Sequence, residues 1–213
     1  MHKNIADIRK DYSLHSLNEN EAASNPLEQF SKWWNDAVKS EILEVNAMTL
    51  ATSTKNGKPS ARIVLLKDFD ERGFVFFTNY DSKKGETLAG NPYAALIFFW
   101  KEIERQIRIE GTVEKVSAEE SDAYFFSRPE GSRIGAWVSP QSKIIKNRSV
   151  LDDNVEKYKT EFKNSIPRPP HWGGYRVMPE LMEFWQGRSN RLHDRLQYTK
   201  TASGSWKVDR LAP

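Results

Sequence analysis

The sequence contains no cysteine among its 213 residues. This absence excludes disulfides, thiolate metal sites and cysteine nucleophiles, and it fits a reducing compartment. The four histidines are scattered along the chain and do not have the spacing of a zinc motif (His2, His15, His171 and His193). We therefore expect no bound metal.

Long apolar runs and a dominant charge are also missing. The sequence has no apolar run long enough to cross a membrane, and its first residues lack the apolar region of a signal peptide, so we expect a cytoplasmic protein. The net charge is only +3, from 32 basic and 29 acidic residues of mixed order. Because no basic stripe or tail is present, we expect no nucleic-acid partner.

The residues that are present support a folded, strand-rich domain. Hydrophobic residues make up 38% of the chain and aromatic residues 12%. Asn25, Pro26 and Glu28 predict the start of a helix. Its apolar stripe is expected from the helical spacing of five residues (Leu27, Phe30, Trp34, Ala37 and Val38).

After this helix the apolar period changes to two. Three strands are expected within residues 47–80, with turns at Asn56-Gly57 and at 70–73, and two more within 93–117. Helices are expected at 1–12, 82–90, 118–127 and 149–163. Strands are expected again at 181–187, 191–200 and 205–211, with a turn at Ser203-Gly204. The pattern predicts a mainly β protein with inserted helices, in which residues 25–213 form one domain built on an antiparallel barrel. A Rossmann domain is not expected, because no GxGxxG motif occurs.

Arg62 and Lys67 are the first candidate ligand-binding cations. They bracket the apolar run "IVLL" and are five residues apart, so on a regular strand they would face opposite sides, roughly 17 Å apart. If both are functional, they are expected to bind two different anions. The alternative is that both are solvated strand ends.

Two further segments also allow both a functional and a structural interpretation. Ser82 can cap a helix whose first turn holds Lys83 and Lys84, where an anion could bind, or the turn is simply solvated. Gln106 could offer its amide to a heterocycle, or lie on an exposed strand face.

The segment "YFFSRPEGS" places Tyr124, Arg128 and Ser132 at helical spacing. Pro129 interrupts a continuous helix, so these three phosphate donors could converge only through a turn. The alternative is a capped helix end.

The segment "WQGRSNRLHDR" gathers three arginines and a histidine. In an extended chain, Arg191, His193 and Arg195 would share one face, with Leu192 and Asp194 on the other. These potential cations would repel one another unless a ligand or acidic neighbours lie near them.

Four motifs in their order give the chain a resemblance to a known family. They are "RIVLLK", "SRPEGSRIGAWVSPQS", "FWQGRSNRLHDR" and "WKVDRLAP". This combination resembles the pyridoxamine 5′-phosphate oxidase family over nearly the whole chain. The resemblance implies an FMN-binding split β-barrel, a homodimer with FMN at its interface, and oxidation of pyridoxine or pyridoxamine 5′-phosphate to pyridoxal 5′-phosphate. Oxygen would be the final acceptor and would give hydrogen peroxide.

The resemblance also implies site residues by position. Those matched to FMN contacts are Arg62, Ile63, Val64, Leu65, Leu66, Lys67, Phe77, Thr78, Lys83, Lys84, Gln106, Gln141, Ser142, Trp185 and Arg195. Those matched to the substrate phosphate are Lys67, Tyr124, Arg128 and Ser132. Arg191 and His193 match residues over the substrate ring and are the catalytic candidates. Arg9, Lys10, Asp11 and Tyr12 match a segment, within residues 1–24, that closes over the site.

Two rival functions remain open at this stage. One is a split-barrel flavoprotein with another activity, such as a flavin reductase or a non-enzymatic FMN binder. The other is a barrel that binds nucleic acid, which would need a basic groove with exposed aromatic residues.

Overall fold

The computed structural model describes residues 4–8, 10–163 and 165–213. The chain divides into two compact units, one formed by Met1–Leu50, Ala95–Gly111 and Pro179–Pro213, the other by Ala51–Ala94 and Thr112–Met178. Four strands contribute residues to both units: β1 (Ala47–Ser53), β5 (Tyr93–Trp100), β6 (Arg105–Lys115) and β7 (Trp172–Gln186). Among the described residues, no helix combines the length and apolar character that a membrane crossing needs.

The strands of the described residues belong to one hydrogen-bonded sheet of nine. Besides the four above, they are β2 (Pro59–Leu65), β3 (Asp68–Asp70), β4 (Gly73–Asn79), β8 (Asp194–Lys200) and β9 (Trp206–Arg210). The order is β2-β1-β5-β6-β7-β4-β3, and β8 pairs with β7 and β9. The pairs β3–β4, β4–β7, β7–β8 and β8–β9 are antiparallel, as the sequence predicts.

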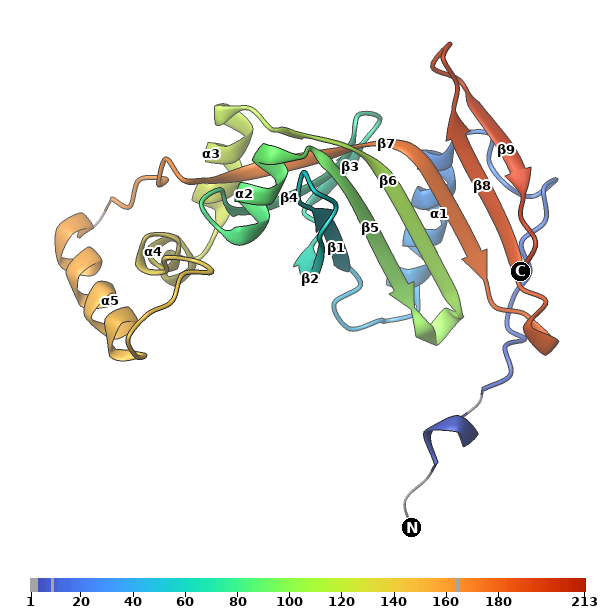
Figure 1. Ribbon diagram of the computed structural model, residues 1–213, viewed down its shortest axis with the longest axis horizontal. Coiled ribbons are helices and arrows are strands. Elements are labelled where there is room, and N and C mark those ends of the chain that lie inside the picture. Colours follow the sequence, from blue (N-terminus) through green and yellow to red (C-terminus); the bar gives the residue numbers. More distant parts are fainter. Residues whose placement is uncertain (1–3, 9, 164) are drawn as a thin grey trace. The chain divides into compact units, whose positions relative to one another are not determined.

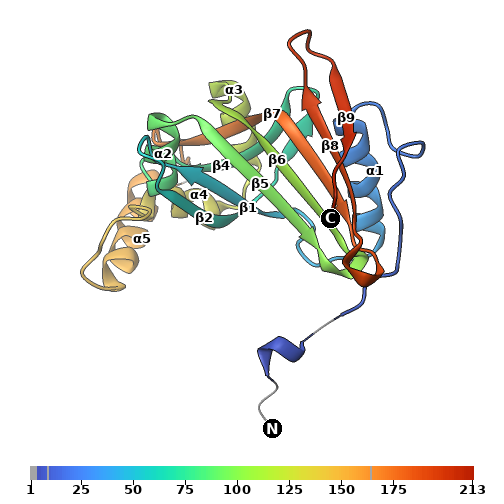
Figure 2. The ribbon, with the colours of Figure 1, turned by 45° about the vertical axis from the view of Figure 1, so that its right-hand side comes forward.

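In the first unit, helix α1 (Pro26–Lys39) packs against the sheet (Figures 1 and 2). The Asn25 side chain accepts a hydrogen bond from the Leu27 N–H, which confirms the predicted cap. Phe30 packs against Phe98 at 5.4 Å between ring centroids. The predicted stripe is partly wrong, because Trp33 rather than Trp34 is buried and Val38 is 49% exposed.

The second unit contains α2 (Lys83–Gly90), α3 (Ala118–Ser127), α4 (Glu130–Val138) and α5 (Ser149–Phe162). Three of these confirm the predicted helices, but α4 was not predicted. Arg128 is extended and Pro129 stands at the N-cap of α4, so the chain turns between α3 and α4. Figure 1 shows α4 beside α5, and the two helices share an apolar cluster that includes Phe125 and Trp172.

Arg176 of β7 ties two elements of the second unit together. Its guanidinium is 2% exposed and lies 2.6 Å from Asp70 and 2.8 Å from Glu120. Asp70 begins the predicted turn that leads to Gly73, and Glu120 lies on α3. These two ion pairs of the buried arginine fix the β3–β4 hairpin and α3 to the same strand.

Two terminal segments differ from the predicted elements. In place of a helix over residues 1–12, the described part has only the short 3-10 helix η1 (Ile5–Asp7), with Ile5 85% exposed. The strand expected from 191 starts at Asp194, because the 3-10 helix η3 (Ser189–Arg191) precedes it. Asn190 and Arg191 have φ values of 56° and 61°. The predicted shared face of Arg191, His193 and Arg195 is therefore wrong, since it required a continuous strand.

Candidate functional site

The second unit contains a cavity of about 350 Å³ lined by many of the predicted residues. Its walls come from the end of β2, from β4, from α2 and from α3. The predicted residues that line it are Arg62, Ile63, Val64, Leu65, Lys67, Phe77, Thr78, Lys84, Tyr124, Arg128 and Gln141. The other lining residues, Asn79 and Trp172, were missed by the sequence analysis.

Arg62 and Lys67 reach this same cavity from either end of the apolar run. Strand β2 ends at Leu65, and Leu66 turns into the core with 4% exposure. The expected placement on opposite faces of one regular strand is therefore wrong. Arg62 donates to Thr52 at 2.9 Å and to Ser60 at 2.8 Å, while the Lys67 ammonium lies 5.8 Å from the centre of the Tyr124 ring.

Lys84 lies on the same wall with neutral partners. Its ammonium donates to Gln141 at 2.8 Å and to Thr78 at 3.2 Å. Burial lowers the pKa of Lys84, and the nearby Arg62 lowers it further. Burial also lowers the pKa of Arg62. Two half-buried cations that repel each other make this wall favourable for an anion.

Arg128 lies over a stack of aromatic rings. Phe77 stacks on Tyr124 at 4.0 Å and on Trp172 at 5.5 Å, and the Arg128 guanidinium lies 4.7 Å from the Trp172 centroid. Among the described residues, Nη1 of Arg128 is buried with no hydrogen-bond acceptor. Burial lowers the pKa of Arg128. An unsatisfied cationic donor at the end of a cavity points to an acceptor from a ligand.

Ser132 lies next to Arg128 in an adjoining cavity of about 210 Å³. The turn at Pro129 produces this placement, because Ser132 is in the first turn of α4 and its N–H bonds to the Pro129 carbonyl. Trp172 and Gln141 line this cavity too. Arg128 and Ser132 thus meet through a turn, as the functional alternative for this segment required, while Tyr124 shares only the first cavity with Arg128.

The donor set fits a phosphate-bearing cofactor with a planar ring. Arg62, Lys84 and Arg128 are half-buried or partly buried cations, and the partners named above for Lys84 are neutral. The apolar side chains of residues 63–65 and the Phe77 ring give the same cavity an apolar wall. A phosphate would compensate the buried charge, and a ring system would cover the apolar wall.

The first unit contains a separate cavity of about 770 Å³. It is lined by Lys10, Asp11 and Tyr12 on one side and by Arg191 and His193 on the other, with Ile8, Arg188 and Asn190. Arg9 lies outside the described residues. The N-terminal segment thus borders the two catalytic candidates, as the resemblance implies.

His193 lies between two aromatic rings of this unit. Its ring centroid is 4.6 Å from Trp185 and 6.1 Å from Tyr12. Nδ1 of His193 accepts the backbone N–H of Arg188 at 3.1 Å. Burial lowers the pKa of His193, the neighbouring Arg191 lowers it further, and Asp194 opposes both. The ring is therefore neutral near pH 7 and carries its proton on Nε2.

Two family models match consecutive parts of the chain. Residues 34–162 match the model described as pyridoxamine 5′-phosphate oxidase. Residues 172–213 match the model of the pyridoxine 5′-phosphate oxidase C-terminal dimerisation region. The chain belongs to the pyridoxamine 5′-phosphate oxidase family.

Similar proteins support membership of the oxidase family over the full length. Pyridoxine/pyridoxamine 5′-phosphate oxidases of Gloeothece citriformis and Nostoc punctiforme are 61% and 60% identical, each over 100% of both chains. The crystal structure of PhzG from Burkholderia lata, in complex with tetrahydrophenazine-1-carboxylic acid, is 31% identical, with a TM-score of 0.88 over 94% of this chain and 100% of that chain. The predicted fold class, a mainly β, antiparallel FMN-binding split barrel with inserted helices, is confirmed.

Several residues matched to family FMN contacts do not line the cavities described above. Leu66 is buried in the core, and Lys83 and Ser142 are exposed. Gln106 is half-buried on β6, between the buried Arg105 and Ile107. The predicted alternation of that strand is confirmed.

Arg195, also matched to a family FMN contact, is held by an acidic partner that the sequence analysis missed. Its Nε donates to Glu183 at 2.9 Å, and Arg108 donates to the other oxygen of the same carboxylate at 2.9 Å. The Glu183 side chain is 3% exposed. A single charge within the apolar run "LMEFW" was the available signal, because buried strands rarely hold an unpaired carboxylate.

Arg188 and Asp194 have no function assigned from the sequence. In the structure they belong to a group of polar contacts centred on Asp194. Asp194 accepts from Arg188 at 3.3 Å, from Arg210 at 3.0 Å and from the Leu17 N–H at 3.1 Å. These contacts give Asp194 a structural role.

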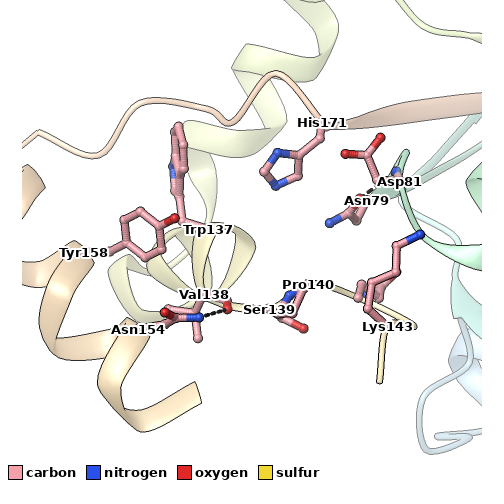
Figure 3. Close-up of a pocket in the computed structure, with 11 residues that line it drawn as sticks. Asn79, Asp81, Trp137, Val138, Ser139, Pro140, Lys143, Asn154, Tyr158 and His171 are labelled. Atoms are coloured by element: carbon pink, nitrogen blue, oxygen red, sulfur yellow. Dashed lines mark hydrogen bonds between the residues drawn. The ribbon is translucent and has the colours of Figure 1, made fainter. Parts of the chain in front are cut away.

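A further cavity of about 290 Å³ lies in the second unit (Figure 3). Figure 3 shows His171 and Asp81 on one side, Trp137 and Tyr158 on another, and Lys143 toward α2. Among the predicted family residues only Gln141 lines it. We assign it no part in the site.

Proposed function

We propose that this chain oxidises pyridoxine 5′-phosphate and pyridoxamine 5′-phosphate to pyridoxal 5′-phosphate, with O2 as final electron acceptor. The observation that carries the proposal is the group of desolvated cations, Arg62, Lys84 and Arg128, around one cavity with an unsatisfied donor. Two bound phosphates, one from the cofactor and one from the substrate, would compensate the charges of these three cations. The names of relatives about 60% identical agree with the assignment.

The cofactor is FMN. Arg62 and Lys84 hold its phosphate, Thr78 and Gln141 add polar contacts, and Gln106, Trp185 and Arg195 contact its ring. Bound FMN would supply the two-electron acceptor for a hydride from C4′, and O2 would reoxidise it with release of H2O2. The amine substrate would also take up water and release ammonia. The protein contributes position and charge.

The substrate phosphate is held at a distance from the reacting carbon. Lys67, Tyr124, Arg128 and Ser132 bind it, and Arg128 supplies the donor that is otherwise unsatisfied. Binding energy from this remote group aligns C4′ and so increases turnover as well as affinity.

Arg191 and His193 orient the substrate ring. The neutral His193 accepts at Nδ1 from Arg188, so its Nε2–H is a donor toward the substrate. Arg191 provides a positive charge beside it that lowers the proton affinity of the imidazole. His193 therefore holds a substrate oxygen or nitrogen by donation, and the proton that the C4′ hydroxyl or amine loses passes to water.

Three features of the assembly belong to the same proposal. Residues 9–12 close over bound substrate, and residues 25–213 work as one FMN-binding domain. Two copies of the chain form a homodimer with FMN at the interface, which the match to a dimerisation region supports. The enzyme works in the cytoplasm, on pathways that make and salvage vitamin B6.

A second candidate is a split-barrel flavoprotein that acts on another substrate. The likeness to PhzG, solved with a tetrahydrophenazine acid, favours it. Such a protein would bind FMN but would not need the second phosphate site.

The test combines purified protein, FMN and air with pyridoxine 5′-phosphate, and measures pyridoxal 5′-phosphate and peroxide. Unphosphorylated pyridoxine is the matched control substrate. The proposal expects both products from the phosphate ester and a strongly reduced rate from pyridoxine. FMN binding without either product would support the second candidate instead.

A further inference from the structure

Glu104 is a buried carboxylate that belongs to none of the groups assigned above. It follows the short 3-10 helix η2 (Lys101–Ile103) between β5 and β6, and its side chain is 2% exposed. Its backbone has the left-handed conformation, with φ 55° and ψ 40°. A non-glycine residue in that region costs free energy, so its side chain must be held by compensating contacts.

Among the described residues, the side-chain contacts of Glu104 go to the N-terminal segment. Oε1 of Glu104 lies 3.1 Å from the Lys10 ammonium. Oε2 accepts the backbone N–H groups of Ser13 at 2.9 Å and of Leu14 at 3.1 Å. Burial raises the pKa of Glu104, but these three donors outweigh it and the pKa is lowered. The carboxylate is therefore ionised at neutral pH and holds the segment 10–14 by charge-assisted hydrogen bonds.

The segment that Glu104 holds forms one wall of the cavity in the first unit. The Tyr12 ring packs edge-on against Trp185 at 5.8 Å and lies 6.1 Å from His193. The Tyr12 carbonyl accepts from the Ser189 hydroxyl at 3.2 Å, and Asp11 accepts the Asn190 N–H at 3.4 Å. These distal contacts are longer than the bonds at Glu104, and the contact between Asn190 and Asp11 is also exposed.

Gly187 allows Tyr12 to approach this closely. A Cβ added at Gly187 would lie 2.8 Å from both Cβ and Cγ of Tyr12. The Gly187 N–H donates to the Glu104 carbonyl at 2.8 Å, so the anchor and the glycine are joined by their backbones. Glu104 holds the segment, and Gly187, which has no side chain, leaves space for Tyr12.

We propose that Glu104 is a positioning residue, whose carboxylate holds the segment 10–14 closed so that Tyr12 lies beside His193 and Trp185. Without it, the segment opens and the fraction of protein with a complete cavity decreases. Apparent substrate affinity decreases by that fraction, while saturating substrate can still select the closed form. The effect on substrate rests on the proposed function, whereas the closure of the segment does not.

The first experiment measures closure without any substrate. The FMN-loaded, full-length protein is treated with trypsin, and cleavage after Lys10 is followed by mass spectrometry. Glu104→Ala removes all three contacts, and Glu104→Gln keeps an oxygen for the backbone donors but loses the ion pair. Glu102→Gln is the matched control, since Glu102 is exposed on the same turn and pairs only weakly with Lys101 at 3.7 Å.

The expected order of cleavage rates is Glu104→Ala, then Glu104→Gln, then parent and Glu102→Gln together. Charged hydrogen bonds of this kind predict a rise of roughly 10-fold or more for Glu104→Ala. Gly187→Ala opens the segment by steric contact without changing the anchor and is expected to give a similar rise. If the Glu104 variants do not fold, Gly187→Ala tests whether the closed segment limits cleavage, and a rate equal to that of the parent would overturn the proposal. If they fold, equal rates in Glu104→Ala and the parent would overturn it.

The second experiment measures oxidation of pyridoxine 5′-phosphate by the same variants. We expect KM to rise roughly 10-fold in Glu104→Ala with kcat changed less than about two-fold. Faster cleavage with an unchanged KM would overturn the positioning of the site by Glu104. If the parent protein produces no pyridoxal 5′-phosphate, the proposed function fails, and the cleavage rates alone still decide whether Glu104 holds the segment.

Discussion

Arg128 and Trp172 form a cation–π pair, with the guanidinium carbon 4.7 Å from the centre of the indole. The residues lie 44 positions apart in the chain, and the aromatic stack on Phe77 and Tyr124 fixes the ring that carries the cation. The contact orients Arg128 but leaves Nη1 without an acceptor. The arginine is thus pre-oriented for an anion at little further cost in side-chain entropy.

The first prediction concerns the substrate phosphate. Arg128→Met removes the charge and the unsatisfied donor, so we expect KM for pyridoxine 5′-phosphate to rise roughly 10- to 100-fold. Steady-state kinetics measure this. Arg148→Met, at an exposed arginine of the same unit, is the control and should leave KM unchanged. An equal KM in the Arg128 variant would refute its contact with the phosphate.

The second prediction separates cofactor affinity from stability at Lys84. Its lowered pKa means that the folded apoprotein is destabilised by the charged amine, with stability rising as pH increases from the lowered value toward 10.5. Lys84→Met should therefore not lower the Tm of the apoprotein. It should weaken FMN binding roughly 10-fold or more, because the phosphate loses a charged donor. Flavin fluorescence quenching and thermal unfolding measure the two effects.

Lys58 is the control for that experiment, because it is an exposed lysine of the same unit with no assigned ligand contact. Lys58→Met should bind FMN within a few-fold of the parent protein. A loss at Lys58 as large as that at Lys84 would contradict the assignment of the phosphate contact to Lys84.

The third prediction follows from the hydrogen bond at Nδ1 of His193. The pKa of His193 is lower in the folded protein than its usual value of 6.5. The stabilisation that the neutral ring provides is therefore complete above pH 6.5. It is lost as the pH falls from 6.5 through the lowered pKa. We expect kcat/KM to fall on that acidic side. His193→Gln, which can place an amide N–H near the Nε2 position, should keep more activity than His193→Asn.

The pH profile of His193→Gln provides the check. It should lose the acidic decrease that is due to this residue, because glutamine does not titrate. Greater activity in His193→Asn than in His193→Gln would show that the donor at Nε2 is not what the reaction needs.

The fourth prediction concerns the stability of the first unit. Glu183→Leu leaves Arg108 and Arg195 without their shared carboxylate, which is 3% exposed. We expect a loss of about 1.5–3 kcal/mol in the free energy of unfolding, since both guanidinium groups retain some access to water. Urea unfolding measures this. Glu180→Leu, at an exposed position of the same strand, should change stability far less.

Local sequence signals predicted most elements of the fold. Asn25 and Pro26 begin α1, Ser82 caps α2, and Pro129 separates two helices, because caps and proline act on their immediate neighbours. The alternation around Ile107 and Ile109 also predicted which side chains of β6 are buried. The sequence was sufficient to predict an element where its start, end or buried face depends on neighbouring residues.

The predictions failed where a local pattern was continued past a break in the backbone. Arg191 was placed on a strand, but its φ of 61° in η3 ends the alternation before Asp194. Arg62 and Lys67 were separated on a strand that ends at Leu65. The alternation of apolar and polar residues does not indicate at which residue a strand ends.

The sequence by itself determined the charge, the caps, the strand pattern and the motifs by which the chain resembles its family. The tertiary structure alone decided which carboxylate meets which cation. Glu183 reaches Arg108 across 75 residues, and Glu104 reaches Lys10 across 94. Such pairs depend on strand register and on long-range packing, which place distant residues together without leaving a local signal.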